Sequence, residues 1–167
     1  MKKNLSLQIN GQNISREVNI HQTLADFLRD DLELTGTHIG CDSVSCGACT
    51  ILLNNLPVKS CAILALSCQN ANVMTVESLS EDCTHPLQQS FKKNFALQCG
   101  FCTPGFLMMG LSLWQKGKEY SSKEIAEYLK GNLCRCTGYI PIIQAISEAI
   151  KGNTKNEEGE SVGKSKL

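Results

Sequence analysis

The fold is decided by residues 40–50, which read GCDSVSCGACT. Three cysteines in this segment, Cys41, Cys46 and Cys49, follow the spacing C-x4-C-x2-C. Glycine, serine and cysteine replace any regular apolar pattern here, which is typical of a loop that folds around something other than its own side chains. Gly40 and Gly47 allow backbone N–H groups to approach such a group closely. We therefore expect a ligand-binding loop at this position.

The residues on either side of this loop predict a small mixed sheet with one short helix. Residues 4–20 contain two alternating apolar runs separated by Asn10-Gly11, which is typical of a β-hairpin. Thr23 and Asp26 fit a helix cap, and apolar residues follow at helical spacing. We expect further strands at residues 50–53, 56–67 and 73–76, with Asn54-Asn55 as the turn between the first two.

The spacing of the three cysteines is that of plant-type [2Fe–2S] ferredoxins, in which a fourth cysteine arrives from elsewhere in the chain. A hairpin turning at Asn54-Asn55 places Cys49 within one position of Cys61. Cross-strand neighbours have Cβ atoms roughly 4.5–5.5 Å apart, close enough to share one cluster. Cys61 is therefore the predicted fourth ligand, while Cys68 and Cys83 are interpreted as buried or incidental thiols.

The second half of the chain changes to a helical period. We expect helices at residues 86–95, 104–115, 122–130 and 141–151, three of which carry a proline in their first turn. The second helix is apolar nearly all round, so it is either the central helix of a bundle or is covered by a partner. The polar segment after Gly152 lacks periodicity and is expected to be disordered.

A second group of cysteines, Cys99-x2-Cys102 and Cys134-x-Cys136, stands just before two of these helix starts. Helix N-termini supply partial positive charge and free N–H donors, which suit an anionic cluster held by four thiolates. Zinc is the competing interpretation, because four thiolates also satisfy zinc and C-x2-C pairs are common in structural zinc sites. At the first site, the x4 spacing and the wrapping loop favour iron–sulfur over zinc.

Composition excludes several classes of function. Lys and Arg number 16, and Asp and Glu also number 16, so the net charge of zero provides no field for binding nucleic acid. No apolar run reaches the length of a membrane span or a secretory signal, so we expect a cytoplasmic protein without membrane insertion. Ten cysteines in such a protein indicate metal ligation rather than disulfides. No glycine-rich dinucleotide or phosphate motif is present.

The segments GCDSVSCGACT, QCGFCTPGF and GNLCRCTGY together resemble the small iron–sulfur subunits of the molybdenum hydroxylases, the family of xanthine dehydrogenase, aldehyde oxidoreductase and carbon monoxide dehydrogenase. The resemblance runs from about residue 3 to residue 151 and includes the order and spacing of eight cysteines. It implies an α+β fold, with a ferredoxin-like β-grasp domain at residues 1–78 and a four-helix bundle at residues 79–152. Residues 153–167 would form the disordered polar tail.

The resemblance also implies two [2Fe–2S] clusters. The ligands of the cluster on the flavin side would be Cys41, Cys46, Cys49 and Cys61. The ligands of the cluster on the molybdenum side would be Cys99, Cys102, Cys134 and Cys136. Gln98 and Cys136 would in addition lie against the pterin of the molybdenum cofactor.

The function implied by the resemblance is electron transfer within an oxidoreductase complex. Electrons would pass from a molybdopterin-type molybdenum cofactor on a large subunit, through both clusters, to FAD on a middle subunit of a heterotrimer. We expect no catalytic residue and no substrate site on this chain. Two other interpretations are a free-standing ferredoxin-like electron carrier and a zinc-stabilised interaction module. His38 is expected either to contact the ligands of the first cluster without binding the cluster itself or to lie on the surface. Arg135 is expected to tune the reduction potential of the second cluster, to reach a partner or to face solvent.

Overall fold

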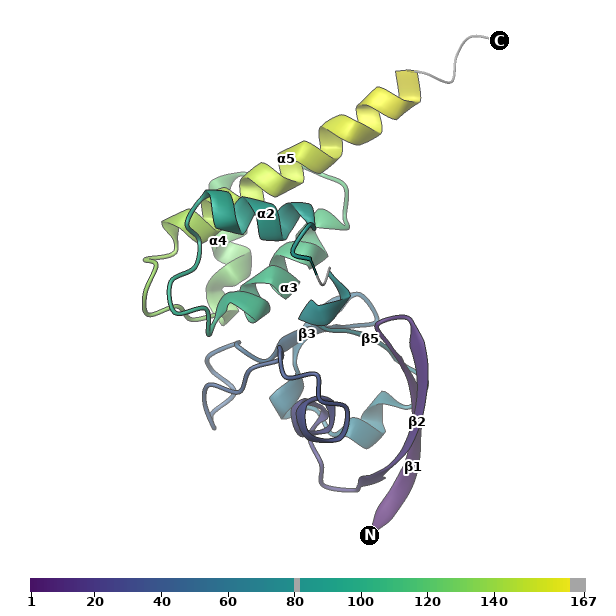
Figure 1. Cartoon of the computed structure of the whole chain (residues 1–167). Helices are drawn as coiled ribbons and strands as arrows, with labels where there is room; N and C mark the ends of the chain where they lie inside the picture. The colour runs from purple at the N-terminus through teal and green to yellow at the C-terminus, as the bar shows by residue number, and fades with distance from the viewer. Residues whose placement is uncertain (80–81, 163–167) are drawn as a thin grey trace, which may run out of the picture.

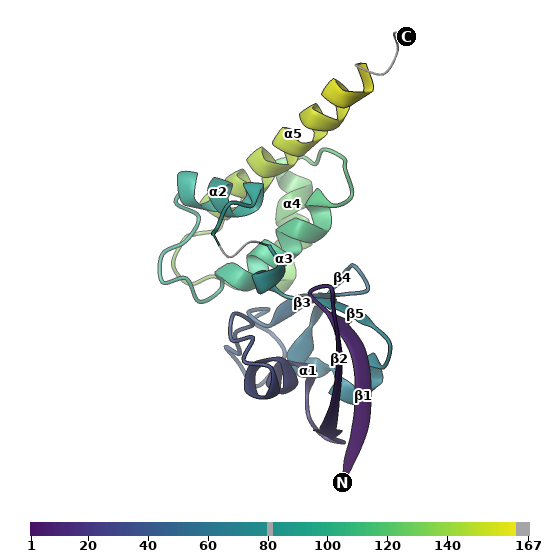
Figure 2. The ribbon, with the colours of Figure 1, turned by 45° about the vertical axis from the view of Figure 1, so that its right-hand side comes forward.

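A five-stranded mixed sheet forms the N-terminal part of the chain, in the computed structural model that describes residues 1–79 and 82–162. The strand order is β2-β1-β5-β3-β4 (Figures 1 and 2). β1 and β5 are parallel, and the other neighbours are antiparallel. The strands are β1 (Lys2–Ile9), β2 (Gln12–Asn19), β3 (Thr50–Leu53), β4 (Leu56–Lys59) and β5 (Asn72–Met74).

Two tight turns set the register of this sheet, as the sequence predicts. Asn10 and Gly11 both have positive φ, 49° and 81°, and so do Asn54 and Asn55, at 49° and 64°. Two consecutive residues with positive φ form the turn whose twist matches that of the flanking strands, and asparagine and glycine are the residues that tolerate it. The second turn pairs Thr50 with Lys59, which fixes where the chain leaves the cysteine loop.

The returning strand is shorter than predicted. β4 ends at Lys59 rather than near residue 67, and the chain continues through two 3-10 turns, Ser60–Ala62 and Ala65–Cys68. The Ser60 hydroxyl donates a hydrogen bond of 2.8 Å to the carbonyl oxygen of Cys49, and this local bond favours the turn over a continued ladder. The last strand also ends early, at Met74, because Val76–Ser78 forms another 3-10 turn.

One short helical segment covers the sheet, as expected. The Thr23 side chain accepts a hydrogen bond from Asp26 N–H and caps α1 (Leu24–Asp26), which continues as one π-helical turn, Phe27–Asp31. Leu24, Phe27 and Leu28 are fully buried against strand residues of the N-terminal core. The arrangement is that of the predicted ferredoxin-like α+β domain.

Helices form the second part of the chain and build a separate apolar core. They are α2 (Pro86–Lys93), α3 (Thr103–Trp114), α4 (Ser122–Tyr128) and α5 (Ile140–Val162), with a 3-10 turn at Leu129–Gly131 after α4. Every residue of α3 from Gly105 to Leu113 is buried, which identifies it as the central helix of the bundle. The alternative that a partner covers α3 is not needed to explain its composition.

α5 is longer than the sequence predicts. The helix runs to Val162 and projects away from the bundle (Figure 1), beyond the end predicted at residue 151, while the disorder expected of residues 153–167 stays a prediction. The segment contains no proline, and each residue added to an existing helix gains a hydrogen bond without a new nucleation cost. The remainder of the predicted tail, residues 163–167, lies outside the described residues.

The two cores meet along β3 and the start of α3. Leu52 of β3 is fully buried and belongs to the core of the helical part, where it packs with residues of the bundle. A Cβ placed on Gly105 would lie only 2.3 Å from the carbonyl oxygen of Gly47, so α3 and the cysteine loop touch backbone to backbone. This contact brings the two cysteine groups to the same side of the junction.

Candidate iron–sulfur sites

The first cysteine group lies in the loop between the π-helical turn Phe27–Asp31 and β3. Backbone N–H groups of this loop point at the thiol of Cys41, and the N–H of Cys46 donates to its sulfur at 3.5 Å. These hydrogen bonds, with that of Cys46 foremost, lower the pKa of Cys41 to about 6. The loop therefore stabilises a thiolate, the form of cysteine that binds metal.

Cys61 lies next to Cys49 as the sequence predicts, but in the 3-10 turn after β4 rather than in a strand. The Sγ atoms of Cys49 and Cys61 lie 3.3 Å apart, because Ser60 N–H donates to the carbonyl oxygen of Cys49 at 3.2 Å and extends the β3–β4 register by one pair. Burial, together with the neighbouring Cys49 thiol, raises the pKa of Cys61 to about 12. Two thiolates this close need positive charge between them, which ferric iron supplies.

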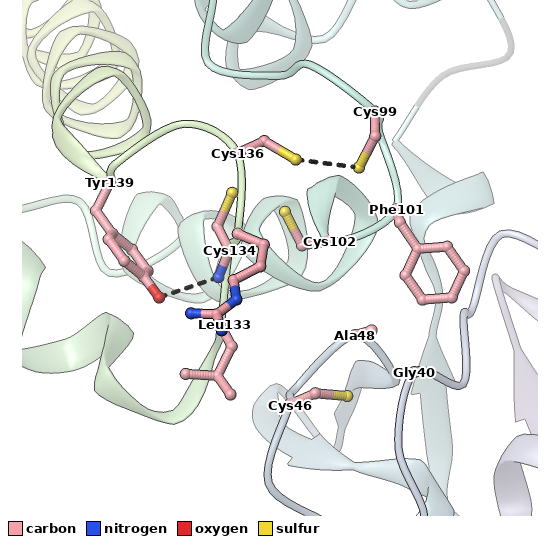
Figure 3. A pocket seen from close by; sticks show the side chains of 11 residues that line it. Gly40, Cys46, Ala48, Cys99, Phe101, Cys102, Leu133, Cys134, Cys136 and Tyr139 are labelled. Atoms are coloured by element: carbon pink, nitrogen blue, oxygen red, sulfur yellow. Dashed lines mark hydrogen bonds between the residues drawn. The ribbon is translucent and has the colours of Figure 1, made fainter.

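The second cysteine group lies where the loops before α3 and α5 meet. The Sγ atoms of Cys99 and Cys136 are 3.6 Å apart, and those of Cys102 and Cys134 project toward the same space (Figure 3). Burial raises the pKa of Cys102 to about 12, with a further contribution from Cys134. Four thiols from two loops thus converge, as the sequence predicts.

Cys134 is held by neighbours that favour its thiolate. Burial by itself raises the pKa of Cys134, but hydrogen bonds from the Thr137 hydroxyl and N–H outweigh burial and lower it. The hydroxyl oxygen lies 3.1 Å from the sulfur and the N–H donor 3.4 Å from it. The N–H of Cys134 donates to the Tyr139 hydroxyl at 3.1 Å, which fixes the backbone of the ligand loop (Figure 3).

A cavity of about 560 Å³ opens between the two groups. Its wall includes Cys46 from the first group and all four cysteines of the second, so it reaches both proposed cluster sites (Figure 3). The lining is completed by Gly40, Ala48, Phe101, Leu133, Arg135 and Tyr139.

The donor sets fit [2Fe–2S] clusters. Each group offers four thiols, of which one pair lies within 3.3 or 3.6 Å, and backbone N–H donors that can reach anionic sulfur. Within residues 1–79 and 82–162, no three His, Cys, Asp or Glu side chains are grouped as the ligands of a single ion. The Thr103 hydroxyl, next to Cys102, is buried without a hydrogen-bond partner in the part of the chain described here. The fit to iron–sulfur chemistry therefore rests on the four thiols of each group and on the backbone N–H donors.

The remaining residues singled out from the sequence lie in different parts of the molecule. Gln98 is exposed directly before Cys99, and Cys136 is also exposed, so both can be reached from outside the chain. His38 stacks on Phe101 and its Nδ1 lies 2.8 Å from the Phe101 carbonyl oxygen, which joins the two ligand loops. Cys68 is buried in the N-terminal core and Cys83 is exposed, and all ten cysteines are free thiols.

Sequence reasoning missed several residues that support the two groups. Lys59 donates from Nζ to the carbonyl oxygens of Val44 and Ser45, at 2.8 and 3.1 Å, and so ties down the first ligand loop. Asn132 is buried between the two ligand loops. A polar residue two positions before Cys134 is visible in the sequence, but its distant partner is not.

Comparison with known families agrees with this geometry. Residues 7–71 match the family described as 2Fe-2S iron-sulfur cluster binding domain, and residues 75–147 match the family described as [2Fe-2S] binding domain. The chain is therefore an iron–sulfur protein with two [2Fe–2S]-binding domains in tandem.

Full-length relatives define the family further. The chain is 51% identical over 146 residues to caffeine dehydrogenase subunit gamma of Pseudomonas sp. (strain CBB1), covering 85% of this chain and 87% of the relative. It is 44% identical over 155 residues to the nicotine 6-hydroxylase small subunit of Paenarthrobacter nicotinovorans, covering 93% of both. The crystal structure of quinoline 2-oxidoreductase from Pseudomonas putida 86 superposes with a TM-score of 0.88 at 42% identity, covering 94% of this chain and 98% of that one.

The chain belongs to the family of small iron–sulfur subunits of the molybdenum hydroxylases. Its function is electron transfer within an oxidoreductase complex, and complexes of this family carry their molybdenum cofactor and FAD on other subunits. The interpretations as a free-standing carrier or a zinc module are less well supported. None of the described helices is long and apolar enough to cross a membrane.

Proposed function

We propose that this chain holds two [2Fe–2S] clusters and relays electrons one at a time from the molybdenum cofactor of a large subunit to FAD on a middle subunit. The observation that carries the proposal is that two separate sets of four thiols each gather in one place, and that a single cavity is lined by Cys46 of the first set and by all four cysteines of the second. The proposed ligands of the N-terminal cluster are Cys41, Cys46, Cys49 and Cys61. The proposed ligands of the C-terminal cluster are Cys99, Cys102, Cys134 and Cys136.

The C-terminal cluster is the entry point for electrons in this proposal. Cys99 and Cys136 are exposed at the outer edge of their site, and Gln98 stands beside them. A partner can therefore bring the pterin of its cofactor against Gln98 and Cys136 without rearranging the bundle. The amide of Gln98 offers both a donor and an acceptor for the polar edge of a pterin.

The N-terminal cluster is the exit point toward FAD. Its loop carries Cys41 and the exposed Val44, so the flavin subunit would approach the side of the loop that faces away from the helical bundle. We place the assembly in the cytoplasm, because ten free thiols suit a reducing compartment.

The test is metal analysis of the anaerobically purified chain and of matched serine variants. The intact chain should contain about four irons and four sulfides and, after reduction, give two distinct paramagnetic signals. Cys61→Ser should lose the signal of the N-terminal cluster and about two irons, and Cys99→Ser should lose the other signal.

Cys68→Ser is the matched control, since Cys68 is buried in the N-terminal core and belongs to neither ligand set. Its iron content should equal that of the unsubstituted chain. Loss of iron in Cys68→Ser but not in Cys61→Ser would reject the ligand assignment. Nicotine, caffeine and quinoline, the compounds in the names of the relatives, are the first candidate substrates to test on the assembled complex.

A further inference from the structure

One thiol of the second cysteine group lies within hydrogen-bond distance of a side-chain hydroxyl. Thr137 Oγ1 is 3.1 Å from Cys134 Sγ, and the N–H of Thr137 donates to the same sulfur at 3.4 Å. A cysteine that binds metal is a thiolate, and a thiolate has no proton to donate. When Cys134 acts as a ligand, the Thr137 hydroxyl is therefore the donor of this hydrogen bond.

The turn that follows Thr137 directs the hydroxyl proton. Gly138 and Tyr139 both have positive φ, 69° and 71°, and the N–H of Tyr139 donates to Thr137 Oγ1 at 3.2 Å. A hydroxyl has one proton and two acceptor lone pairs. Because the Tyr139 N–H uses one lone pair, the proton is left to point at Cys134 Sγ. The backbone thus holds the hydroxyl in the orientation of a donor to sulfur.

Burial strengthens this hydrogen bond. Cys134 is 8% exposed, whereas Cys99 and Cys136 of the same group are exposed and can be solvated. A hydrogen bond to a charged acceptor is stronger where the surroundings have a low dielectric constant. A buried sulfur also has little access to water that could replace a missing donor. The Thr137 hydroxyl therefore stabilises negative charge at the ligand that solvent stabilises least.

Hydroxyl groups beside the first cysteine group are used differently. Ser43 and Ser45 of the ligand loop place their hydroxyl oxygens 2.9 Å from each other. The Thr50 hydroxyl donates to the Gly47 carbonyl oxygen at 2.7 Å, and the Ser60 hydroxyl donates to a carbonyl oxygen as well. These four hydroxyls bond to oxygen, whereas that of Thr137 bonds to a ligand sulfur. The difference predicts that a change at Thr137 affects one cluster and leaves the other unchanged.

We propose that Thr137 raises the reduction potential of the C-terminal cluster through its hydroxyl hydrogen bond to Cys134. The inference rests on the proposed ligand sets. Thr137 is a positioning residue, since it acts through a ligand. Reduction of the site adds one electron, which converts one ferric ion to ferrous and increases the negative charge on the ligand sulfurs. The electron comes from the molybdenum centre of the large subunit, which is oxidised; no bond forms or breaks, and the Thr137 proton stays on its oxygen.

The direction of the effect follows from charge. A hydrogen bond to a ligand sulfur stabilises the reduced cluster more than the oxidised one, because the reduced cluster carries one more negative charge. The hydroxyl therefore makes the C-terminal cluster the better electron acceptor. This favours electron entry from the large subunit without any contact between Thr137 and the molybdenum cofactor.

A purely structural role of Thr137 makes a different prediction. The loop is also held by the hydrogen bond of 3.1 Å that the N–H of Cys134 donates to the Tyr139 hydroxyl (Figure 3). Tyr139→Phe removes this bond and leaves the donor to the sulfur in place. It is therefore the matched control for loosening of the loop without loss of the sulfur hydrogen bond.

The test compares the full chain containing both clusters with Thr137→Val, Thr137→Ser and Tyr139→Phe. Valine keeps the shape of threonine and lacks the hydroxyl, while serine keeps the hydroxyl. Iron content and both midpoint potentials are measured for each. Proton hyperfine spectroscopy of the reduced clusters, before and after exchange into deuterated water, detects a donor proton near the sulfur.

Thr137→Val should keep about four irons and lose one exchangeable proton from the signal of the C-terminal cluster. At a fixed potential, its ratio of reduced to oxidised C-terminal cluster should fall up to about tenfold, a midpoint shift of up to about 59 mV toward negative values for one electron. The potential of the N-terminal cluster should stay constant. Thr137→Ser should retain the proton and most of the potential, and Tyr139→Phe should retain both.

An unchanged C-terminal potential in iron-complete Thr137→Val would overturn the proposal. So would an equal shift in Tyr139→Phe, which would assign the effect to the shape of the loop. Should Thr137→Val lose iron, Thr137→Ala removes the same hydroxyl and decides by the same criterion.

Failure of the proposed function would be visible separately, in the unsubstituted chain. A protein that binds zinc, or that gives fewer than two reduced-cluster signals, rejects the ligand sets before any variant is compared. A four-iron chain whose C-terminal potential is insensitive to the Thr137 hydroxyl rejects the role of Thr137 alone.

Discussion

Gly105→Ala should wedge the two parts of the chain apart where they touch. The added Cβ would lie 2.3 Å from the Gly47 carbonyl oxygen and 3.3 Å from the Ala48 Cα, both backbone atoms that cannot rotate away. Overpacking of this kind costs about 1–3 kcal/mol, and replacing a helical glycine with alanine returns about 1 kcal/mol at most. We expect a net loss of about 1–2 kcal/mol in the free energy of unfolding.

The assay is thermal unfolding of the holo chain, followed by circular dichroism and by the visible absorption of the clusters. In a chain of this size, about 1 kcal/mol corresponds to about 2–4 °C in the unfolding midpoint, so Gly105→Ala should unfold about 2–8 °C lower. Loss of cluster absorption should come at the same or a lower temperature than loss of helix, since the wedge lies beside the ligand loop.

Gly110→Ala is the control within the same helix. Its Cβ would lie 3.2 Å from side-chain atoms of Ile146 and Leu87, which can yield by small rotations, unlike the backbone that faces Gly105. The midpoint of Gly110→Ala should therefore fall less than that of Gly105→Ala. If Gly105→Ala unfolds at or above the temperature of Gly110→Ala, the backbone contact does not hold the junction and our reasoning fails.

Two further predictions concern charge. Burial lowers the pKa of His85 below its ordinary 6.5, and its Nδ1 accepts a hydrogen bond of 3.2 Å from Leu87 N–H at the start of α2. Because the unfolded chain binds this proton more readily, the contribution of His85 to the free energy of unfolding should be complete above pH 6.5 and fall as the pH drops toward the lowered pKa. His85→Asn keeps a cap acceptor, so its free energy of unfolding should depend less on pH between about pH 7.5 and 5.5. A pH dependence equal to that of the unsubstituted chain would contradict the assignment. Lys59→Met removes a positive charge held 2.8 Å from the Val44 carbonyl oxygen beside the N-terminal site. In a redox titration, the midpoint potential of the N-terminal cluster should therefore become more negative, while that of the C-terminal cluster stays constant. An unchanged potential would show that the Lys59 charge does not act on the cluster.

The ligand loops could be predicted from sequence because their signals are local. C-x4-C-x2-C and the Asn54-Asn55 turn together bring Cys61 to Cys49, and the register of a tight hairpin follows from its turn residues. The helices of the second half follow in the same way from first-turn prolines and apolar spacing. The errors occurred where a local pattern had no tertiary check, as in the strand that ends at Lys59 and the helix α5 that continues to Val162.

The sequence by itself determined the class of fold, the two groups of four cysteines and the chemistry that those groups can bind. Only the tertiary structure decided how the groups face each other, because Asn132 meets Gly47 across a separation of 85 residues and no short-range pattern encodes that pair. The side chains that can bind one metal centre are recognised from their spacing along the chain. The distance between two such centres is selected by how tightly two backbones can approach, and at Gly47 and Gly105 that approach depends on the absence of a Cβ.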